Sequence, residues 1–180
     1  MTGATDKDSV VLVDLKDGEV GIAGKLDAHR RGLTHRAISV FIRNAGGALL
    51  LQRRAEAKYH SGGLWANACC SHPLPAEKAA DAARRRLAEE MGIDCALQPL
   101  FRTHYRAEVS DDLIEDEVVH VFGGRYDGPV KPDPAEVSEW RWASLPELER
   151  DLQARPKQYA PWLHHYVRAH REAIAQWMAG

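Results

Sequence analysis

Residues 64–93 constrain the fold and chemistry of this chain more than any other stretch, because they join two unlike segments. The first ends in ACCSHP (68–73), where prolines at 73 and 75 keep the backbone extended. The second is rich in alanine and charge, which predicts a helix that begins near Ala76 and ends at Gly92. The stretch therefore predicts a thiol and an imidazole placed directly before a helix.

The two reactive side chains of the extended segment are Cys70 and His72. Alternate side chains of a strand point to the same side, so these two face one way. A thiol and an imidazole on one side are typical either of a metal site or of an activated nucleophile or base. The motif alone does not choose between them. Cys69 is interpreted as a small buried hydrophobe.

The predicted helix has an unusual C-terminal end. Glu89 and Glu90 lie where the helix dipole disfavours anions, unless a cation compensates. Arg86, four residues before Glu90, lies on the flank of the helix. A solvated charged surface is the ordinary interpretation of such acids, but beside arginines they indicate a metal or phosphate site. The predicted buried stripe is Ala80, Ala83, Leu87 and Met91.

Charge and cysteine content narrow the class of protein. The chain has 24 Lys and Arg against 26 Asp and Glu, so no broad surface for nucleic acid or membrane is expected. Three cysteines, two of them adjacent, do not form a disulfide framework, and a reducing, cytoplasmic setting is expected. We predict no signal peptide and no membrane span. The 180 residues suit one domain, with residues 1–9 loose.

The remaining segments predict strands first and helices at the end. The predicted strands are 10–13, a segment ending at Ile22, 36–43, 48–52, parts of 95–108, 114–122 and 140–142. The first two strands form a hairpin, as do 36–43 and 48–52. A short helix begins at Ser144 with a capping signature, and a terminal helix covers 161–178. This order predicts an α+β fold, with a mixed sheet packed between helices and an N-terminal hairpin extension.

Candidate metal ligands come from a predicted basic loop (25–35), the central motif and the strand 114–122. Alternation places two acids of that strand on one face, where they repel each other unless a positive group lies between them. Three imidazoles and two carboxylates suit zinc, manganese or magnesium. The set is His29, His35, His72, Glu115 and Glu117. The histidines interpreted as non-ligands are His60, His104 and His120.

A basic cluster, Arg53, Arg54 and Lys58, follows the strand 48–52. Such a cluster is usually solvated. Near a metal site it can instead bind an anionic substrate, and the arginine fork matches phosphate geometry. Trp162, at the start of the terminal helix, is either a core residue or an aromatic wall of a site.

The central stretch resembles a degraded Nudix box, which runs glycine, five residues, glutamate, seven residues, arginine, glutamate, aliphatic, any residue, two glutamates, any residue, glycine, aliphatic. The matching positions are Glu77, Arg85, Leu87, Glu89, Glu90, Gly92 and Ile93. Ser71 stands where the first glycine belongs, and Arg86 stands where a metal-binding glutamate belongs. These departures argue against ordinary Nudix pyrophosphohydrolase chemistry, because a cation replaces an acid.

With these departures, the chain resembles type 1 isopentenyl-diphosphate delta-isomerase, a Nudix-fold family, over residues 25–162. The motifs that carry the resemblance are the paired histidines 29 and 35, Cys70-Ser71-His72-Pro73, Glu90-Met91-Gly92, Tyr105, Glu115-Asp116-Glu117 and Pro161-Trp162. The resemblance implies an enzyme that interconverts isopentenyl and dimethylallyl diphosphate, by protonating an alkene and removing an allylic proton. It places the enzyme in isoprenoid biosynthesis.

The resemblance also implies roles for individual residues. The five candidate ligands would bind a metal, and Glu90 would help to hold a magnesium ion on the diphosphate. Glu117, with Tyr105, would protonate the double bond. Cys70 would remove the allylic proton as a thiolate, with its pKa lowered from ~8.5 by neighbouring cations. Trp162 would stabilise the carbocation through its π face. The implied diphosphate contacts are Lys25, Arg54, Lys58, Ser71 and Arg86.

The implied cofactors are Mg²⁺ with the diphosphate and one further divalent metal, Mn²⁺, Zn²⁺ or Mg²⁺. The implied partner is a small prenyl diphosphate, with no nucleic acid and no membrane, and the chain is expected to be a monomer or weak homodimer. Two other functions stay open. A Nudix diphosphohydrolase would need the acid cluster that Arg86 disrupts. A silent diphosphate sensor would have no use for Cys70, Tyr105 and Glu117 together.

Overall fold

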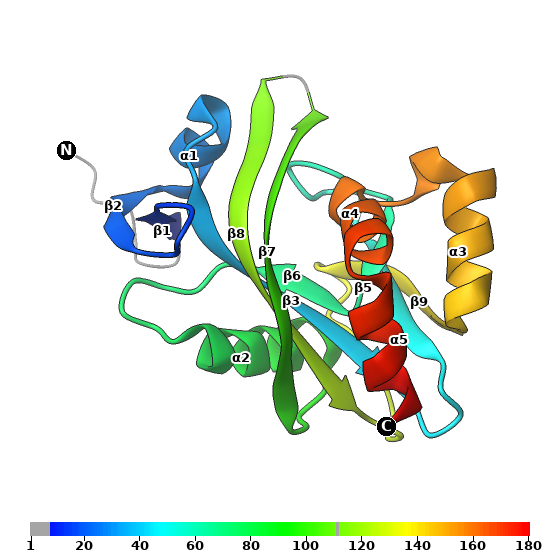
Figure 1. The fold of residues 1–180 in the computed structure, drawn as a ribbon. Helices are drawn as coiled ribbons and strands as arrows, with labels where there is room; N and C mark the ends of the chain where they lie inside the picture. Colours follow the sequence, from blue (N-terminus) through cyan, green and yellow to red (C-terminus); the bar gives the residue numbers. More distant parts are fainter. Residues whose placement is uncertain (1–7, 111) are drawn as a thin grey trace.

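The computed structural model describes residues 8–110 and 112–180, and within them the strands form one mixed nine-stranded sheet (Figure 1). Of the segment expected to be loose, residues 1–7 lie outside this description. The strands are β1 (Ser9–Val13), β2 (Glu19–Gly24), β3 (His35–Arg43), β4 (Leu49–Arg54), β5 (Trp65–Asn67), β6 (Cys69–Ser71), β7 (Leu97–Ser110), β8 (Leu113–Arg125) and β9 (Val137–Ala143). The helices are α1 (Lys25–Arg31), α2 (Ala79–Met91), α3 (Leu145–Ala154), α4 (Pro161–Ala169) and α5 (Arg171–Ala179), with a 3₁₀ turn at Pro156–Gln158.

Strand β3 organises the sheet. It runs parallel to β8 along its whole length, in a register that sets His35 opposite Glu117. On its other edge it pairs with β6, which sets Ser39 opposite Cys70. The predicted hairpin of 36–43 and 48–52 is therefore wrong over most of its length. Strands β3 and β4 pair only beside the turn, and β4 pairs instead with β5 and β9.

Helices cover both faces of the sheet (Figure 1). Helix α2 packs its buried side against one face, and α4 and α5 cover the other, with α3 beyond them. The predicted buried stripe on α2 is confirmed at Ala83, Leu87 and Met91, but Ala80 is exposed. The helix begins at Ala79, later than predicted, because Ala76 has a left-handed backbone (φ +64°) that cannot enter a right-handed helix.

The structure also bears on three other local predictions: the loop 25–35, the helix start at Ser144 and the terminal helix. The predicted loop 25–35 contains α1, which ends at Gly32 in the left-handed conformation that favours glycine. The capping signature at Ser144 is confirmed as a reciprocal capping box with Glu147. The single terminal helix is wrong, because the chain leaves helical geometry at His170 between α4 and α5.

No helix among the described residues combines the length and the apolar character that crossing a bilayer would require. The β1–β2 hairpin predicted at the start of the chain is present and joins the sheet next to β3. Helix α1 follows β2 directly, so this attachment places α1 in contact with β8. The N-terminal extension thus brings α1 to the same region as β6 and β8.

Candidate active site

One pocket brings together most residues that the sequence singled out. Those in its lining are Lys25, Arg54, Lys58, Cys70, Ser71, His72, Arg86, Glu90, Glu115, Glu117 and Trp162. Four further lining residues were not predicted as part of a site: Ile38, Tyr59, His60 and Tyr166. The three remaining candidates, His29, His35 and Tyr105, adjoin lining residues. Segments separated by more than a hundred residues therefore supply one chemically dense pocket.

Four segments carry the candidate metal ligands. Helix α1 supplies His29, the first residue of β3 supplies His35, and His72 directly follows β6. Strand β8 supplies the two acids. The parallel pairing of β3 with β8 brings the strand start at His35 level with Glu117, which explains why residues 82 positions apart meet.

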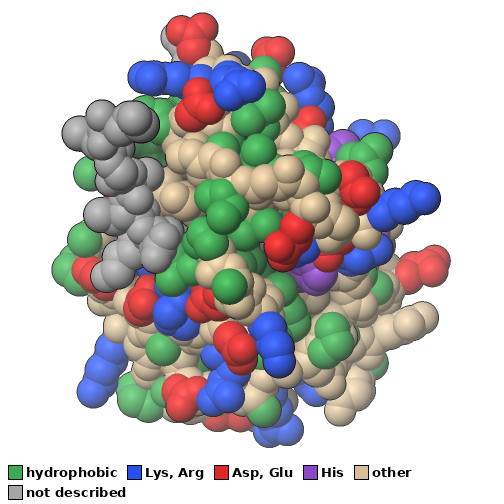
Figure 2. Space-filling model, turned by 90° about the vertical axis from the view of Figure 1, so that its left-hand side faces the viewer, with side chains coloured by type: hydrophobic (Ala, Val, Ile, Leu, Met, Phe, Trp, Pro, Cys, Tyr) green, Lys and Arg blue, Asp and Glu red, His purple; other side chains and the backbone are tan. Residues whose placement is uncertain are grey.

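In a view from the side of the β1–β2 hairpin, little histidine surface is visible (Figure 2).

Backbone carbonyls orient two of the imidazoles. His29 Nδ1 donates to the carbonyl oxygen of Lys25 at 2.7 Å, and His35 Nδ1 donates to that of Leu33 at 2.7 Å. Because each neutral ring carries one N–H, this arrangement leaves the lone pair on Nε2. Such a hydrogen bond on the far nitrogen is the usual support of a metal-binding histidine.

The spacing of the donor atoms fits a divalent ion. His35 Nε2 lies 3.2 Å from His72 Nε2, and Glu117 Oε1 lies 2.9 Å from His72 Nε2 and 3.4 Å from His35 Nε2. Ligands bound at ~2.1 Å lie roughly 3.0–3.4 Å apart in octahedral or tetrahedral arrangements. His29 joins this group, with all four donors within 4.8 Å of one another. This donor set, His29, His35, His72 and Glu117, is called the imidazole cluster below.

Burial sets the charge of these groups. It lowers the pKa of His29, and it lowers that of His72 to about 3, so both imidazoles are neutral. Burial also works to raise the pKa of Glu117, but its contacts with His35 and His72 outweigh this and hold the pKa well below the usual range. Neutral imidazoles beside a carboxylate are in the protonation states that metal binding requires.

Glu115 does not lie within the imidazole cluster, although the sequence predicted it as a ligand of the same set. Its donor group is formed with His29 and His60 instead. Burial, with the neighbouring charge of Glu117, raises the pKa of Glu115 well above its usual range. His60, which the sequence analysis placed outside the set, has Nε2 3.4 Å from Glu115 Oε1. Its only sequence signal is its position before a Ser-Gly-Gly turn, which is weak.

The Cys70 thiol is held by two neighbours that the sequence analysis missed. Its sulfur lies 3.2 Å from Ser39 Oγ and donates to Asn67 Oδ1 at 3.3 Å. Asn67 is itself buried and fixed, because its amide donates to Ser39 Oγ and to the carbonyl of Val40, each at 2.8 Å. An asparagine within a buried apolar strand is the signal that could have found it.

The charge state of Cys70 differs from the one expected. From the sequence alone, neighbouring cations are expected to lower the thiol pKa. Burial dominates instead and raises the pKa of Cys70 to about 12, although Arg54 works to lower it. The resting group is therefore a thiol.

Tyr105 and Trp162 are both buried. Tyr105 lies opposite Glu117 in the antiparallel pairing of β7 with β8, so the two side chains share a face. Burial raises the pKa of Tyr105, which keeps its hydroxyl protonated. The Arg54 guanidinium lies 5.1 Å from the centre of the Trp162 ring, so the face of this indole already attracts a cation.

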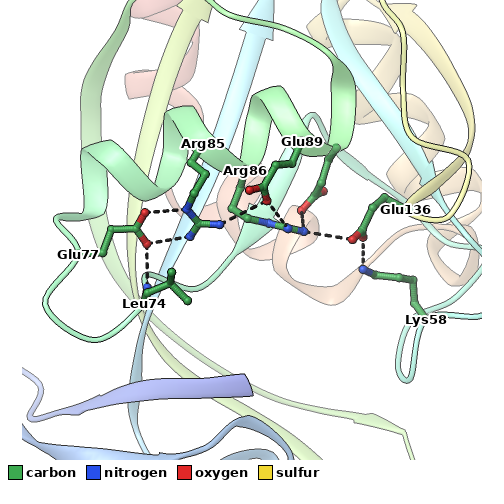
Figure 3. A network of polar contacts seen from close by, with 8 residues as sticks. Lys58, Leu74, Glu77, Arg85, Arg86, Glu89 and Glu136 are labelled. Atoms are coloured by element: carbon green, nitrogen blue, oxygen red, sulfur yellow. Dashed lines mark hydrogen bonds and ion pairs between the residues drawn. The ribbon is translucent and has the colours of Figure 1, made fainter. Parts of the chain in front are cut away.

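The far end of the pocket is a network of ion pairs on and beside α2 (Figure 3). Arg86 Nη2 donates to Glu90 Oε1 at 2.7 Å and to Glu136 Oε1 at 3.2 Å, and Arg86 Nη1 donates to Glu89 at 2.6 Å. Lys58 also donates to Glu136. The acids at the C-terminal end of α2 thus have the compensating cation that the sequence required. Glu136, in the segment before β9, was not predicted. This set, Lys58, Arg86, Glu89, Glu90 and Glu136, is called the ion-pair network below.

Lys25 interacts electrostatically with both ends of the pocket, with Lys58 and Arg86 at one and Glu117 at the other. Burial lowers its pKa to about 8, with further lowering by Lys58, Arg54 and Arg86. Its ammonium lies 5.0 Å from the centre of the Tyr59 ring. Four cations that repel one another in a partly buried pocket favour an anion of high charge.

Comparisons with known proteins agree with this architecture. The model of the NUDIX domain family matches residues 33–165. Two solved structures have similar folds: a Deinococcus radiodurans protein (TM-score 0.69, 21% identity, 82% of this chain and 90% of that one) and the MutT protein of Methanosarcina mazei Go1 (TM-score 0.61, 22% identity, 79% and 91%). At these identities the likeness shows the fold. The fold class predicted from the sequence, an α+β Nudix-like sheet between helices, is confirmed.

Curated relatives define the family more narrowly. Isopentenyl-diphosphate Delta-isomerase 2 of Aromatoleum aromaticum is 54% identical over 157 residues, which cover 87% of this chain and 83% of that protein. Isopentenyl-diphosphate Delta-isomerase of Burkholderia multivorans is 48% identical over 172 residues, 95% of this chain and 98% of that protein. This NUDIX-domain chain therefore belongs to the isopentenyl-diphosphate Delta-isomerase family. Membership implies dependence on a divalent metal, which the donor groups described above fit.

Proposed function

We propose that this chain is an isopentenyl-diphosphate isomerase, which interconverts isopentenyl and dimethylallyl diphosphate in isoprenoid biosynthesis. The relatives at about 50% identity over most of the chain support the activity. The observation that carries it is the single pocket that holds Cys70, Glu117 and a group of cations together. A simple diphosphate hydrolase would have no role for a buried thiol that Asn67 and Ser39 orient.

The proposed chemistry begins with the anionic end of the substrate. Lys25, Arg54, Lys58, Ser71 and Arg86 would contact the diphosphate oxygens. Arginine suits this role, because its planar fork matches phosphate oxygens and stays charged. The diphosphate is remote from the reacting carbons, so its binding energy can position the alkene between the acid and the thiol.

The proton for the alkene would come from the pair formed by Glu117 and Tyr105, which lie opposite each other on β8 and β7. Burial keeps the Tyr105 hydroxyl protonated, while Glu117 is ionised in the resting chain. Protonation of the terminal carbon leaves a tertiary carbocation. The π face of Trp162 would stabilise that cation, by on the order of 2 kcal/mol when desolvated.

Cys70 would accept the allylic proton that the carbocation loses. Because the resting group is a thiol, it has to give up its own proton first. That proton would pass to the ionised Glu117 carboxylate, which then holds the proton for the alkene, while Ser39 Oγ and Asn67 Oδ1 orient the sulfur. One proton is added at one carbon and one is removed at another, so the reaction is an isomerisation with no net change in protons.

The proposed metals follow from the donor types. The imidazole cluster with Glu115 would hold Mn²⁺, Zn²⁺ or Mg²⁺, and its mixed nitrogen and oxygen donors suit the first two well. Glu90 would help to hold Mg²⁺ on the diphosphate, because hard oxygen donors suit that ion. When bound, the ions supply positive charge that offsets the buried acids and the substrate.

We also propose that residues 1–180 form one domain that acts in the cytoplasm as a monomer or weak homodimer. Its partner would be the small prenyl diphosphate, with no nucleic acid and no membrane. The net charge of −2 and the concentration of cations inside one pocket support this partner.

The activity is tested by proton exchange. We would incubate the protein with isopentenyl diphosphate and Mg²⁺ in heavy water and follow the products by NMR, with Cys70→Ala and Glu117→Gln alongside. Deuterated dimethylallyl diphosphate from the wild type, lost in both variants, is the expected result. Release of phosphate or pyrophosphate without isomerisation would contradict the proposal and favour a hydrolase. Tight binding without reaction would favour a sensor.

A further inference from the structure

His60 is a buried imidazole that the proposed chemistry leaves without a role. It lies in the segment that connects β4 to β5 and is only 6% exposed. Three rings surround it: Tyr59 at 4.4 Å between ring centroids, His29 at 5.6 Å and Trp162 at 6.2 Å. A polar ring costs free energy when it is buried, unless its nitrogens have partners. The partners of His60 therefore decide what it does.

Each nitrogen of His60 faces one oxygen. Nε2 lies 3.4 Å from Glu115 Oε1, and Nδ1 lies 3.3 Å from Ser61 Oγ. A neutral imidazole has one N–H and one lone pair. If Nε2–H donates to Glu115, the Ser61 hydroxyl can donate to Nδ1, and both nitrogens are satisfied. One tautomer thus fits both neighbours.

Glu115 needs such a partner. It is 4% exposed and lies outside the imidazole cluster. Its Oε2 has no hydrogen-bond partner within residues 8–110 and 112–180, although it is buried. Its donor group with His60 shares His29 with the cluster, so the two groups adjoin at one residue. A carboxyl group with Oε1 3.4 Å from an imidazole nitrogen, and with Oε2 unpartnered among the described residues, is arranged to bind a cation.

We propose that His60 is a positioning residue of the metal centre, whose Nε2–H holds Oε1 of Glu115 and leaves Oε2 to bind the ion of the imidazole cluster. The inference rests on the proposed function, since it assumes that this cluster binds a metal. Partners that orient a ligand typically contribute 10- to 100-fold to metal affinity.

The test is a titration of the metal-stripped full-length protein with Mn²⁺, in which the electron paramagnetic resonance signal of free Mn²⁺ reports binding. The variants are His60→Ala, His60→Gln, Glu115→Gln and the double variant of His60→Ala with Glu115→Gln. Glutamine is chosen because its amide N–H can replace Nε2–H. His164→Ala is the matched control, since this histidine lies on α4 and bonds the Pro156 carbonyl outside the pocket.

We expect His60→Ala to weaken Mn²⁺ binding 10- to 100-fold, and His60→Gln to stay within about threefold of the wild type. In the Glu115→Gln background, adding His60→Ala should change affinity by less than about twofold, because the two residues act as a unit. The control should bind as the wild type does. Thermal unfolding of the metal-stripped variants shows whether each is folded.

Three results would overturn the role of His60: unchanged binding in His60→Ala, equal loss in His60→Gln, or the same loss with and without Glu115. A merely structural role for His60 would give the last of these. Failure of the wild type to bind Mn²⁺ would overturn the proposed metal site itself, and is thus distinguishable from failure of the His60 assignment. All of these outcomes are measured by Mn²⁺ binding and thermal unfolding, without an assay of isomerase activity.

Discussion

The two ends of the pocket handle polar groups in opposite ways. The imidazole cluster consists of three rings around one carboxylate, all buried except the slightly exposed His72, and each ring is fixed by a short contact. The ion-pair network on α2 keeps full charges on both partners, and Arg86 and Glu136 remain about a fifth exposed (Figure 3). One end has fixed donors with a single negative charge on Glu117, and the other has paired charges that solvent can still reach at Arg86 and Glu136.

This difference suits two kinds of ligand. Fixed imidazole lone pairs beside one carboxylate can bind a small cation. Paired arginine and lysine side chains can exchange a carboxylate partner for a phosphate, because phosphate oxygens accept the same charge-assisted hydrogen bonds. The pocket therefore has one end built for a metal and another built to exchange anions, with the thiol and the acid between them.

Loss of the shared carboxylate should have the largest effect. Glu117→Gln removes the oxygen that contacts both His35 and His72, together with the proposed acid. We expect kcat to fall on the order of 10³-fold, and Mn²⁺ binding to weaken strongly. Steady-state kinetics and metal titration measure both.

The matched control for this variant is Glu77→Gln. Glu77 forms a paired contact with Arg85 on α2 and lies outside the pocket, so kcat should stay within about twofold of the wild type. A Glu117→Gln variant that keeps full activity and metal affinity would remove the basis for distinguishing the two ends.

The pH dependence of substrate binding should be intermediate in size. With its pKa lowered to about 8, Lys25 is charged below that pH and neutral above it, so affinity for the diphosphate should fall as pH rises through 8. Losing one charged hydrogen bond of about 1.5–3 kcal/mol predicts at least a tenfold rise in Kd by pH 9.5. The measurement is calorimetric titration with isopentenyl diphosphate from pH 7.5, where phosphate groups are largely ionised.

Lys25→Arg is the control for this pH effect. Arginine stays charged throughout the range, so the slope above pH 8 should disappear. The same slope in Lys25→Arg would show that a group other than Lys25 titrates.

Removal of Glu136 should have the smallest effect. Glu136→Gln frees Lys58 and Arg86 from a competing carboxylate, so isopentenyl diphosphate should bind about two- to fivefold tighter. The increase should shrink at high salt. Glu139→Gln, an exposed partner of Arg53, should leave binding unchanged. Weaker binding in Glu136→Gln would mean that Glu136 holds the cations in place rather than competing with the substrate.

The sequence predicted the parts of this site that local rules control. Spacing and alternation identified Cys70 with His72 and the two acids of β8, and the motif placed Arg86 where the Nudix box has an acid. The β1–β2 hairpin and the capping box at Ser144 also follow from local chemistry. These features depend on residues close together in the chain.

The features that were predicted wrongly or not at all depend on long-range packing. The pairing of β3 with β8 and β6 overrode the hairpin that the turn at 44–47 predicted. Glu136 reaches Arg86 only because the segment before β9 folds back onto α2, and no local pattern shows that. The Cys70 pKa was misjudged because the degree of burial, which outweighs nearby cations, is a property of the folded chain.

The most direct test of the proposed site is the position of a bound metal. We would grow crystals of the full chain with Mn²⁺ and calculate an anomalous difference map. The site described here predicts a peak ~2.0–2.3 Å from His35 Nε2, His72 Nε2 and Glu117 Oε1. A map with a peak only at Glu89 and Glu90, and none among the three imidazoles, would contradict it.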